Sequence, residues 1–179
     1  MIPFEQIGPG WTLFLDRDGV INVRDFDSYI LNWESFHFTP GLLVAAAQIG
    51  RAFDHVVVVT NQQCIAKGLL STKELDLIHH KMCNELASAG LHIDLVLSAI
   101  EFKNGQEGRR KPQPKMAIEA QQKLPAIDFS KSIMVGDTNT DLQFGKRLGM
   151  YTILIESKEI VKEIPDLRLA YLSELSTYL

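Results

Sequence analysis

The chain has 179 residues, 46% of them hydrophobic, and a net charge of −4 at pH 7, which is typical of a globular protein with one substantial core. The acidic balance argues against nucleic acid as a partner, and no apolar stretch reaches the roughly 18 residues of a membrane span. Cys64 and Cys83 form neither a disulfide framework nor a structural zinc motif, so we expect a cytoplasmic protein with no membrane anchor.

Five short apolar runs predict strands that are buried on both faces, and Val56 to Val59 is the clearest of them. Four helical patterns lie between the runs. Thr39 and Pro40 predict an N-cap and a first turn for the first helix, and the capping box at Ser71–Glu74 opens the second. The strands cover residues 11–15, 55–60, 95–99, 132–135 and 151–155, and the helices cover about 39–50, 71–90, 114–124 and 140–148.

This alternation of strand and helix predicts an α/β fold, in which a doubly wound, mainly parallel sheet lies between two layers of helices. No linker or repeat divides the chain, so we expect residues 1–179 to form a single domain and take a monomer as the default. Residues 23–38 have no sustained period. We interpret them as a small flap, in the form of a short hairpin, over the mouth of a site.

Two carboxylates, Asp16 and Asp18, follow the first apolar run. Side chains alternate along a strand, so the two would lie on the same side if the strand continued. Neighbouring acids repel each other and are unfavourable unless a cation, a shared proton or a reaction needs them. The pair therefore indicates a site that carries out chemistry.

Other predicted strands and helices also meet at polar residues. Thr60 and Asn61 follow the second run, Asp137 and Asp141 follow the fourth, and Lys111 precedes the third helix. The carboxyl ends of parallel strands share one rim, where ligands bind in such folds. Acids, a lysine and a hydroxyl gathered there suit a hard divalent cation and a phosphate.

These residue types predict phosphoryl transfer. Asp16 could attack phosphorus while Lys111 and a magnesium ion neutralise the phosphate oxygens and Thr60 donates a hydrogen bond. Asp18 could give a proton to the leaving alcohol and later take one from water.

Four motifs, in order, resemble those of the haloacid dehalogenase (HAD) superfamily over about residues 11 to 155. The resemblance implies that Asp16 is the nucleophile and that Asp18 is the acid/base and a magnesium ligand through its backbone. It also implies that Asp16 and Asp137 are magnesium ligands and that Thr60 and Lys111 bind phosphate. The motifs are Asp16-Arg17-Asp18-Gly19-Val20, Thr60-Asn61-Gln62, Lys111-Pro112 and Gly136-Asp137-Thr138-Asn139-Thr140-Asp141.

For Asp141 two interpretations stay open at this point. The residue is either an auxiliary metal ligand or a cap of the helix that follows it, where negative charge is favourable.

Finer features are similar to the small uncapped branch that contains the D-glycero-D-manno-heptose 1,7-bisphosphate phosphatases and the histidinol-phosphatases. The intervals between the motifs leave no room for a large cap domain. In this branch the arginine beside the motif lysine contacts substrate, which implies that Arg110, and likewise Asn61, binds substrate. The resemblance implies a Mg²⁺-dependent phosphomonoester hydrolase that forms an aspartyl phosphate, with a sugar phosphate of the heptose 1,7-bisphosphate type as the first choice among small phosphorylated metabolites.

Alternatives follow from the same motifs. Histidinol phosphate is the nearest other substrate. A polynucleotide 3′-phosphatase fits the acidic balance less well, and a non-catalytic binding module would not be expected to keep the motif residues intact. Residues 101–108 lack the zinc loop usual in this branch, so no structural zinc is expected. Cys64 has no base near it in the sequence and is expected to be a small buried hydrophobe rather than a nucleophile.

Overall fold

The structure, a computed structural model, describes residues 1–103 and 108–179, and in this part of the chain six parallel strands form one sheet in the order β3-β2-β1-β4-β5-β6. None of the helices in these residues combines the length and apolar character that crossing a bilayer requires. The strands are β1 (Thr12–Leu15), β2 (His55–Asn61), β3 (Leu95–Ala99), β4 (Ser132–Gly136), β5 (Tyr151–Ile155) and β6 (Leu167–Leu169). The α-helices are α1 (Leu42–Ala52), α2 (Thr72–Ser88), α3 (Lys115–Lys123) and α4 (Asn139–Arg147).

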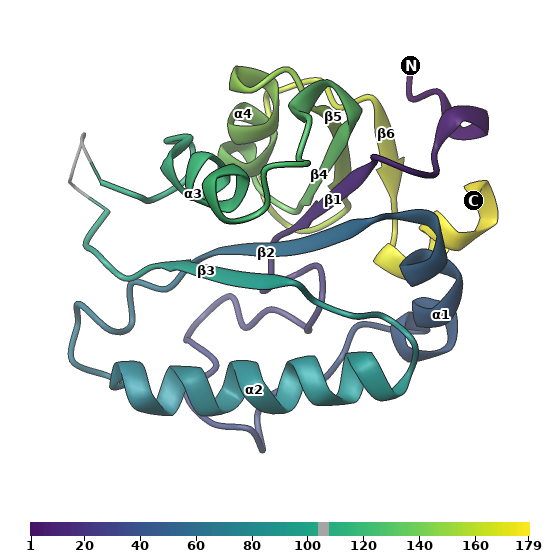
Figure 1. Ribbon diagram of the computed structural model, residues 1–179. Coiled ribbons are helices and arrows are strands. Elements are labelled where there is room, and N and C mark those ends of the chain that lie inside the picture. Colours follow the sequence, from purple (N-terminus) through teal and green to yellow (C-terminus); the bar gives the residue numbers. More distant parts are fainter. Residues whose placement is uncertain (104–107) are drawn as a thin grey trace.

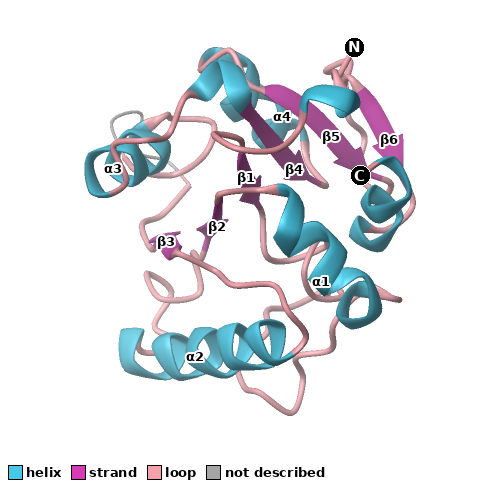
Figure 2. Ribbon diagram, turned by 45° about the vertical axis from the view of Figure 1, so that its right-hand side comes forward, coloured by secondary structure: helices cyan, strands magenta, loops and turns pink. Residues whose placement is uncertain are grey.

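Helices cover both faces of the sheet because side chains alternate along its buried strands. Leu13 and Leu15 of β1 pack in the core beneath α1 and α2, whereas Phe14 packs in the core beneath α3 and α4. All three side chains are fully buried. In both views α2 lies on the side of the sheet away from α3 and α4 (Figures 1 and 2). The predicted three-layer α/β fold is confirmed.

The strand order reverses between β1 and β4, which are neighbours in the sheet although two other strands lie between them in the sequence. Ligands of doubly wound sheets bind outside the carboxyl ends of the strands at such a reversal. Asp16 follows β1 there and Asp137 follows β4. The backbone N–H of Asp16 also donates to the carbonyl oxygen of Val135 at 2.9 Å. The carboxyl ends of β1 and β4 therefore lie next to each other.

One predicted helix start was wrong, and one strand was not predicted. Thr39 does not cap α1, because its hydroxyl donates to the carbonyl oxygen of Val20 at 2.8 Å, and the helix begins at Leu42 after Gly41. The strand β6 was not predicted. It has three residues, of which Leu169 alone is buried, and it lies at the edge of the sheet. So short a strand leaves too little apolar pattern to recognise.

Residues 23–37 contain neither helix nor strand, so the expected hairpin does not form. Asn22 and Phe38 make an isolated antiparallel bridge that closes the segment at its base. The ring of Phe36 packs against Trp33 and Phe38, with ring centroids 4.9 and 5.2 Å apart. Its own aromatic side chains therefore hold this segment, which we call the flap segment (residues 23–38).

Gly50 lets α1 approach the loop that follows α2. A Cβ at this position would lie 2.3 Å from the backbone carbonyl oxygen of Gly90, which cannot yield as the end of a flexible side chain can. We expect Gly50→Ala to lower the free energy of unfolding by about 1–3 kcal/mol, although alanine favours helix. Urea unfolding followed by circular dichroism measures the change. Gly8→Ala is the matched control, because its added Cβ has no atom within 4 Å; equal midpoints for the two variants would contradict the prediction.

Candidate active site

Lys111 is the positive centre of the site. Its Nζ lies 2.8 Å from Asp16 Oδ1 and 2.6 Å from Asp141 Oδ1, and it donates to the carbonyl oxygen of Val59 at 2.6 Å. Burial alone would lower the pKa of Lys111, but the two carboxylates outweigh burial and raise that pKa. The side chain is 1% exposed, so this is a buried ammonium group whose charge is compensated on two sides.

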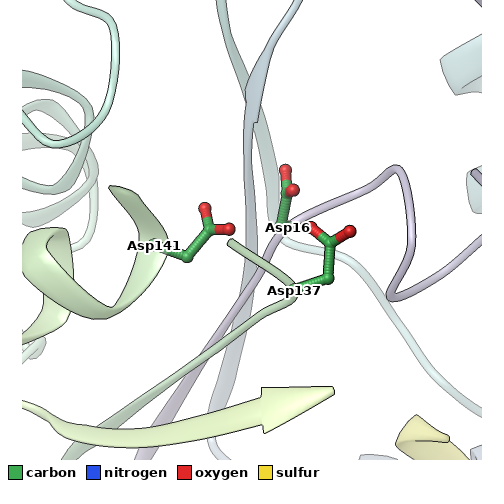
Figure 3. A group of neighbouring side chains, drawn as sticks. All are labelled: Asp16, Asp137 and Asp141. Atoms are coloured by element: carbon green, nitrogen blue, oxygen red, sulfur yellow. The ribbon is translucent and has the colours of Figure 1, made fainter. Parts of the chain in front are cut away.

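Three carboxylates gather around this lysine and the end of β1. Asp16, Asp137 and Asp141 each offer an oxygen, and these oxygens all lie within 4.8 Å of one another (Figure 3). Burial, with the neighbouring carboxylates, raises the pKa of Asp16 to about 6 and that of Asp137 to about 7, although Lys111 and Arg24 oppose the shifts. The cluster therefore holds more negative charge than its protein partners neutralise.

A divalent cation fits this cluster. Asp137 Oδ1 is buried and has no hydrogen-bond partner in the described part of the chain. Magnesium prefers carboxylate oxygens, and its charge would offset the repulsion among the acids. Asp16 and Asp137, two of the three predicted ligands, lie side by side in this cluster.

The structure shows one of the two roles left open for Asp141, that of a helix cap. Its Oδ2 accepts hydrogen bonds from the backbone N–H and the hydroxyl of Thr138, at 3.0 and 2.6 Å, which makes a capping box at the start of α4. Its other oxygen faces Lys111. The helix cap is therefore present, and ligation of a metal by Asp141 stays an open interpretation.

Asp18 lies outside the cluster, in different electrostatic surroundings. Arg17 Nη2 donates to both carboxylate oxygens, at 2.8 and 3.0 Å, and the amides of Asn22 and Gln62 donate at 3.0 and 2.8 Å. Burial alone would raise the pKa of Asp18, but the charge of Arg17 and these donors outweigh burial and lower it. The side chain is therefore a fixed, ionised carboxylate, and its predicted backbone contact with metal stays a prediction.

Thr60 and Arg110 line the same cavity, of about 370 Å³, as Asp16 and Asp18. The Thr60 hydroxyl accepts a hydrogen bond from Gln62 at 2.9 Å. Nη1 of Arg110 has no hydrogen-bond partner among residues 1–103 and 108–179. The fold thus places a hydroxyl and a guanidinium group in one cavity with Asp16 and Asp18, while phosphate binding by Thr60 and substrate binding by Arg110 stay predictions.

Asn61 lines this cavity and also holds the loop that carries the lysine. Its Oδ1 accepts the backbone N–H of Lys111 at 2.9 Å, and its Nδ2 lies 3.4 Å from the carbonyl oxygen of the same residue. The amide therefore ties the end of β2 to the lysine, while substrate binding by Asn61 stays a prediction.

Arg24, from the flap segment, has no counterpart among the predicted site residues. Its Nη1 lies 2.9 Å from Asp137 Oδ2, and its Nη2 lies 2.8 Å from Glu159 Oε1. The guanidinium carbon lies 5.0 Å from the centre of the Phe26 ring. Arg24 and Asp137 are 113 residues apart. The flap segment has no helical or strand periodicity, so the sequence held no pattern that could predict their contact.

Arg17 and His79 make a second contact that was not predicted. Arg17 is 0% exposed, and its Nη1 lies 3.2 Å from Nε2 of His79 on α2. An arginine can only donate, so His79 accepts at Nε2 as a neutral imidazole. Burial and the charge of Arg17 lower the pKa of His79 to about 3. The position of Arg17 between two aspartates was the one sequence feature that could have pointed to a role for it. The sequence did not identify its partner His79, because His79 lies 62 residues away.

Two expectations concern cysteines and zinc. Cys64 is fully buried in the core, and burial raises the pKa of its thiol. Both observations agree with the expected role of Cys64 as a small buried hydrophobic side chain. Cys64 and Cys83 are both free. Residues 104–107, within the segment expected to lack a zinc loop, lie outside the described residues, so the absence of structural zinc stays a prediction.

The fold and this site define an α/β phosphatase of the HAD type, with an aspartate at a strand end, a buried lysine and an acidic cluster at the strand reversal. A family model described as HAD-hydrolase-like matches residues 108–163.

A D-glycero-alpha-D-manno-heptose-1,7-bisphosphate 7-phosphatase of Mycobacterium bovis is 37% identical over 139 residues, which span 78% of this chain and 73% of the relative. A D-glycero-beta-D-manno-heptose-1,7-bisphosphate 7-phosphatase of Mesorhizobium japonicum is 38% identical over 145 residues, 77% of this chain and 65% of the relative.

Among solved structures, the D,D-heptose 1,7-bisphosphate phosphatase of B. bronchiseptica, in complex with magnesium and phosphate, is similar with a TM-score of 0.83 and 27% identity, covering 93% of this chain and 96% of the other. A putative HAD-like phosphatase of Mesorhizobium loti is similar with a TM-score of 0.76 and 31% identity, covering 97% of this chain and 88% of the other.

The chain therefore belongs to the HAD superfamily, in the family that includes these heptose-1,7-bisphosphate 7-phosphatases, and it is a phosphatase.

The neutral state of His79 predicts a loss of stability in acid. The pKa of this histidine is about 3 when folded, against 6.5 as its ordinary value, so the unfolded chain binds more protons below pH 6.5 and stability falls as the pH drops. Between pH 7 and pH 5 we expect the parent to lose about 1–2 kcal/mol more unfolding free energy than His79→Gln. Urea unfolding at both pH values measures this. His80→Gln, at an exposed position on the same helix, should keep the parent's pH dependence; a parent and a His79→Gln variant that respond alike would refute the prediction.

Proposed function

We propose that the protein hydrolyses a phosphate monoester of a small phosphorylated sugar, of the heptose 1,7-bisphosphate type, in a Mg²⁺-dependent reaction through an aspartyl phosphate on Asp16. The observation that carries the proposal is the Asp16 carboxylate at the strand reversal, 2.8 Å from the buried Lys111 ammonium group. The names of the relatives support the sugar, and the neighbour with magnesium and phosphate supports the cation.

Asp16 and Asp137, with the backbone of Asp18 as the resemblance implies, would hold the magnesium ion. When bound, the ion supplies positive charge that offsets the phosphate oxygens and the transition-state charge.

The reaction divides the work between two carboxyl groups. In the first step an oxygen of Asp16 attacks phosphorus, the bond from phosphorus to the alcohol oxygen breaks, and protonated Asp18 gives its proton to that oxygen. In the second step ionised Asp18 takes a proton from water as the water oxygen attacks phosphorus, which breaks the bond to Asp16 and releases inorganic phosphate. Lys111 and Thr60 stabilise the phosphate oxygens by charge and hydrogen bonding.

The size and lining of the cavity support the proposal of a small substrate with more than one phosphate. Its volume of about 370 Å³ is in the range of pockets for small molecules. Lys67 and Arg110 line it together with Asp16, and Tyr29 and Phe26 of the flap segment give it aromatic walls. Two cations beyond Lys111 suit a second phosphate, because a phosphate binds well where positive charges and N–H donors converge.

Asp16→Asn removes the attacking carboxylate and leaves the size of the side chain nearly unchanged. We expect Mg²⁺-dependent release of phosphate from p-nitrophenyl phosphate to fall by about 1,000-fold or more. EDTA should abolish the parent's activity, and added Mg²⁺ should restore it. Asp76→Asn, at an exposed carboxylate of α2, is the matched control. Turnover by Asp16→Asn equal to that of the control would rule out the aspartyl phosphate.

A panel of phosphorylated metabolites tests the substrate through kcat/KM, the ratio in which discrimination resides. We expect both anomers of D-glycero-D-manno-heptose 1,7-bisphosphate to exceed histidinol phosphate by about tenfold or more. Lys67→Met should lower kcat/KM for the bisphosphate and leave that for p-nitrophenyl phosphate, which has no second phosphate, nearly unchanged. A preference for histidinol phosphate would reverse the assignment of the substrate.

A further inference from the structure

Arg17 is a buried cation that the proposed chemistry does not use. Its guanidinium group lies between Asp18, which belongs to the proposed reaction, and His79, which does not. Nε and Nη2 point to the carboxylate of Asp18, at 3.2 Å from Oδ1 and at 2.8 and 3.0 Å from the two oxygens, and Nη1 points to the imidazole of His79. The planar group is therefore fixed at both ends.

The fork geometry matters for Asp18. Two nitrogens of one rigid plane bind the carboxylate, so the direction of the plane determines the direction of the carboxyl group. A lysine could supply the charge but not this direction. Asn22 and Gln62 each add one hydrogen bond to the Asp18 carboxylate, at 3.0 and 2.8 Å. A single hydrogen bond leaves the carboxyl group free to rotate about the axis of that bond.

His79 completes the fixation from another element. It lies in α2, packed on one face of the sheet, and only 6% of it is exposed. Its Nε2 accepts from Arg17, since arginine has no acceptor. Without this acceptor Nη1 would be a buried donor with no hydrogen-bond partner in the described part of the chain, and such a donor is unfavourable enough to make the side chain turn.

We propose that Arg17 and His79 are positioning residues: His79 fixes the plane of Arg17, and Arg17 in turn orients the carboxyl group of Asp18 toward the leaving oxygen. The inference rests on the proposed acid/base role of Asp18. It adds to that role a contact between the reaction centre and α2.

The experiment uses two substrates that differ in the leaving group. Phenyl phosphate releases a strongly basic phenolate, which needs a proton from Asp18, whereas p-nitrophenyl phosphate releases a weakly basic one, which does not. Because kcat/KM covers the steps up to the first irreversible one, transfer to Asp16, it reports the acid step and not the later base step. The ratio of the two kcat/KM values is independent of how much of a preparation is folded.

Three variants and a control are measured with both substrates. His79→Leu removes the acceptor, His79→Gln keeps one, and Arg17→Lys keeps the charge without the fork. We expect His79→Leu and Arg17→Lys to lower kcat/KM for phenyl phosphate about tenfold more than for p-nitrophenyl phosphate, and His79→Gln to keep the parent's ratio. His80→Leu, at an exposed position of the same helix, is the matched control.

The outcomes separate this inference from the proposed function. A parent that releases no phosphate from either substrate would overturn the proposed function and, with it, the acid role. An active parent whose ratio is unchanged in His79→Leu and Arg17→Lys would overturn the positioning role alone. Loss of all folded protein in His79→Leu, with His79→Gln folded, would assign His79 to stability and would likewise overturn it.

Discussion

A buried excess of negative charge is the constraint on which the rest of the site depends. Asp16, Asp137 and Asp141 bring oxygens within 4.8 Å of one another, and carboxylates this close and out of water repel unless cations lie among them. Lys111 and Arg24 reach the cluster in ion pairs of 2.6 to 2.9 Å. One comes from the loop before α3 and the other from the flap segment, so two distant parts of the chain are held in place by the same charges.

The two carboxyl groups at the end of β1 differ in pKa because of what surrounds them. Burial raises the pKa of Asp16 to about 6, with Lys111 opposing it, whereas the charge of Arg17 outweighs burial and lowers the pKa of Asp18. Environments that push the pKa values of two nearby carboxyl groups apart give the two groups different protonation states at the same pH. The low pKa of Asp18 suits the base of the second step directly, whereas in the first step Asp18 has to be protonated.

Sequence patterns predicted what depends on local order and missed what depends on contacts across the chain. The apolar runs and caps gave five of the strands and placed Asp16, Thr60, Lys111 and Asp137 at strand ends or in a loop, because the parallel sheet gathers those ends on one rim. The partner of Arg17 lies 62 residues away and that of Arg24 lies 113 residues away. No period or spacing records such pairs. The capping role of Thr39 failed for the same reason, since its hydroxyl is taken by a carbonyl group 19 residues earlier.

The flap segment lines one side of the cavity in a fold that has no large cap domain among its described residues. A loop that lacks secondary structure needs other contacts to stay in place, and here an isolated bridge and packed aromatic rings hold the base. Nearer the cavity Arg24 binds Asp137 and Glu159, and the cations of Arg24 and Lys158 both lie close to the Phe26 ring. The wall is thus fastened to a carboxylate of the acid cluster. Its position therefore depends on the charge of the site that it encloses.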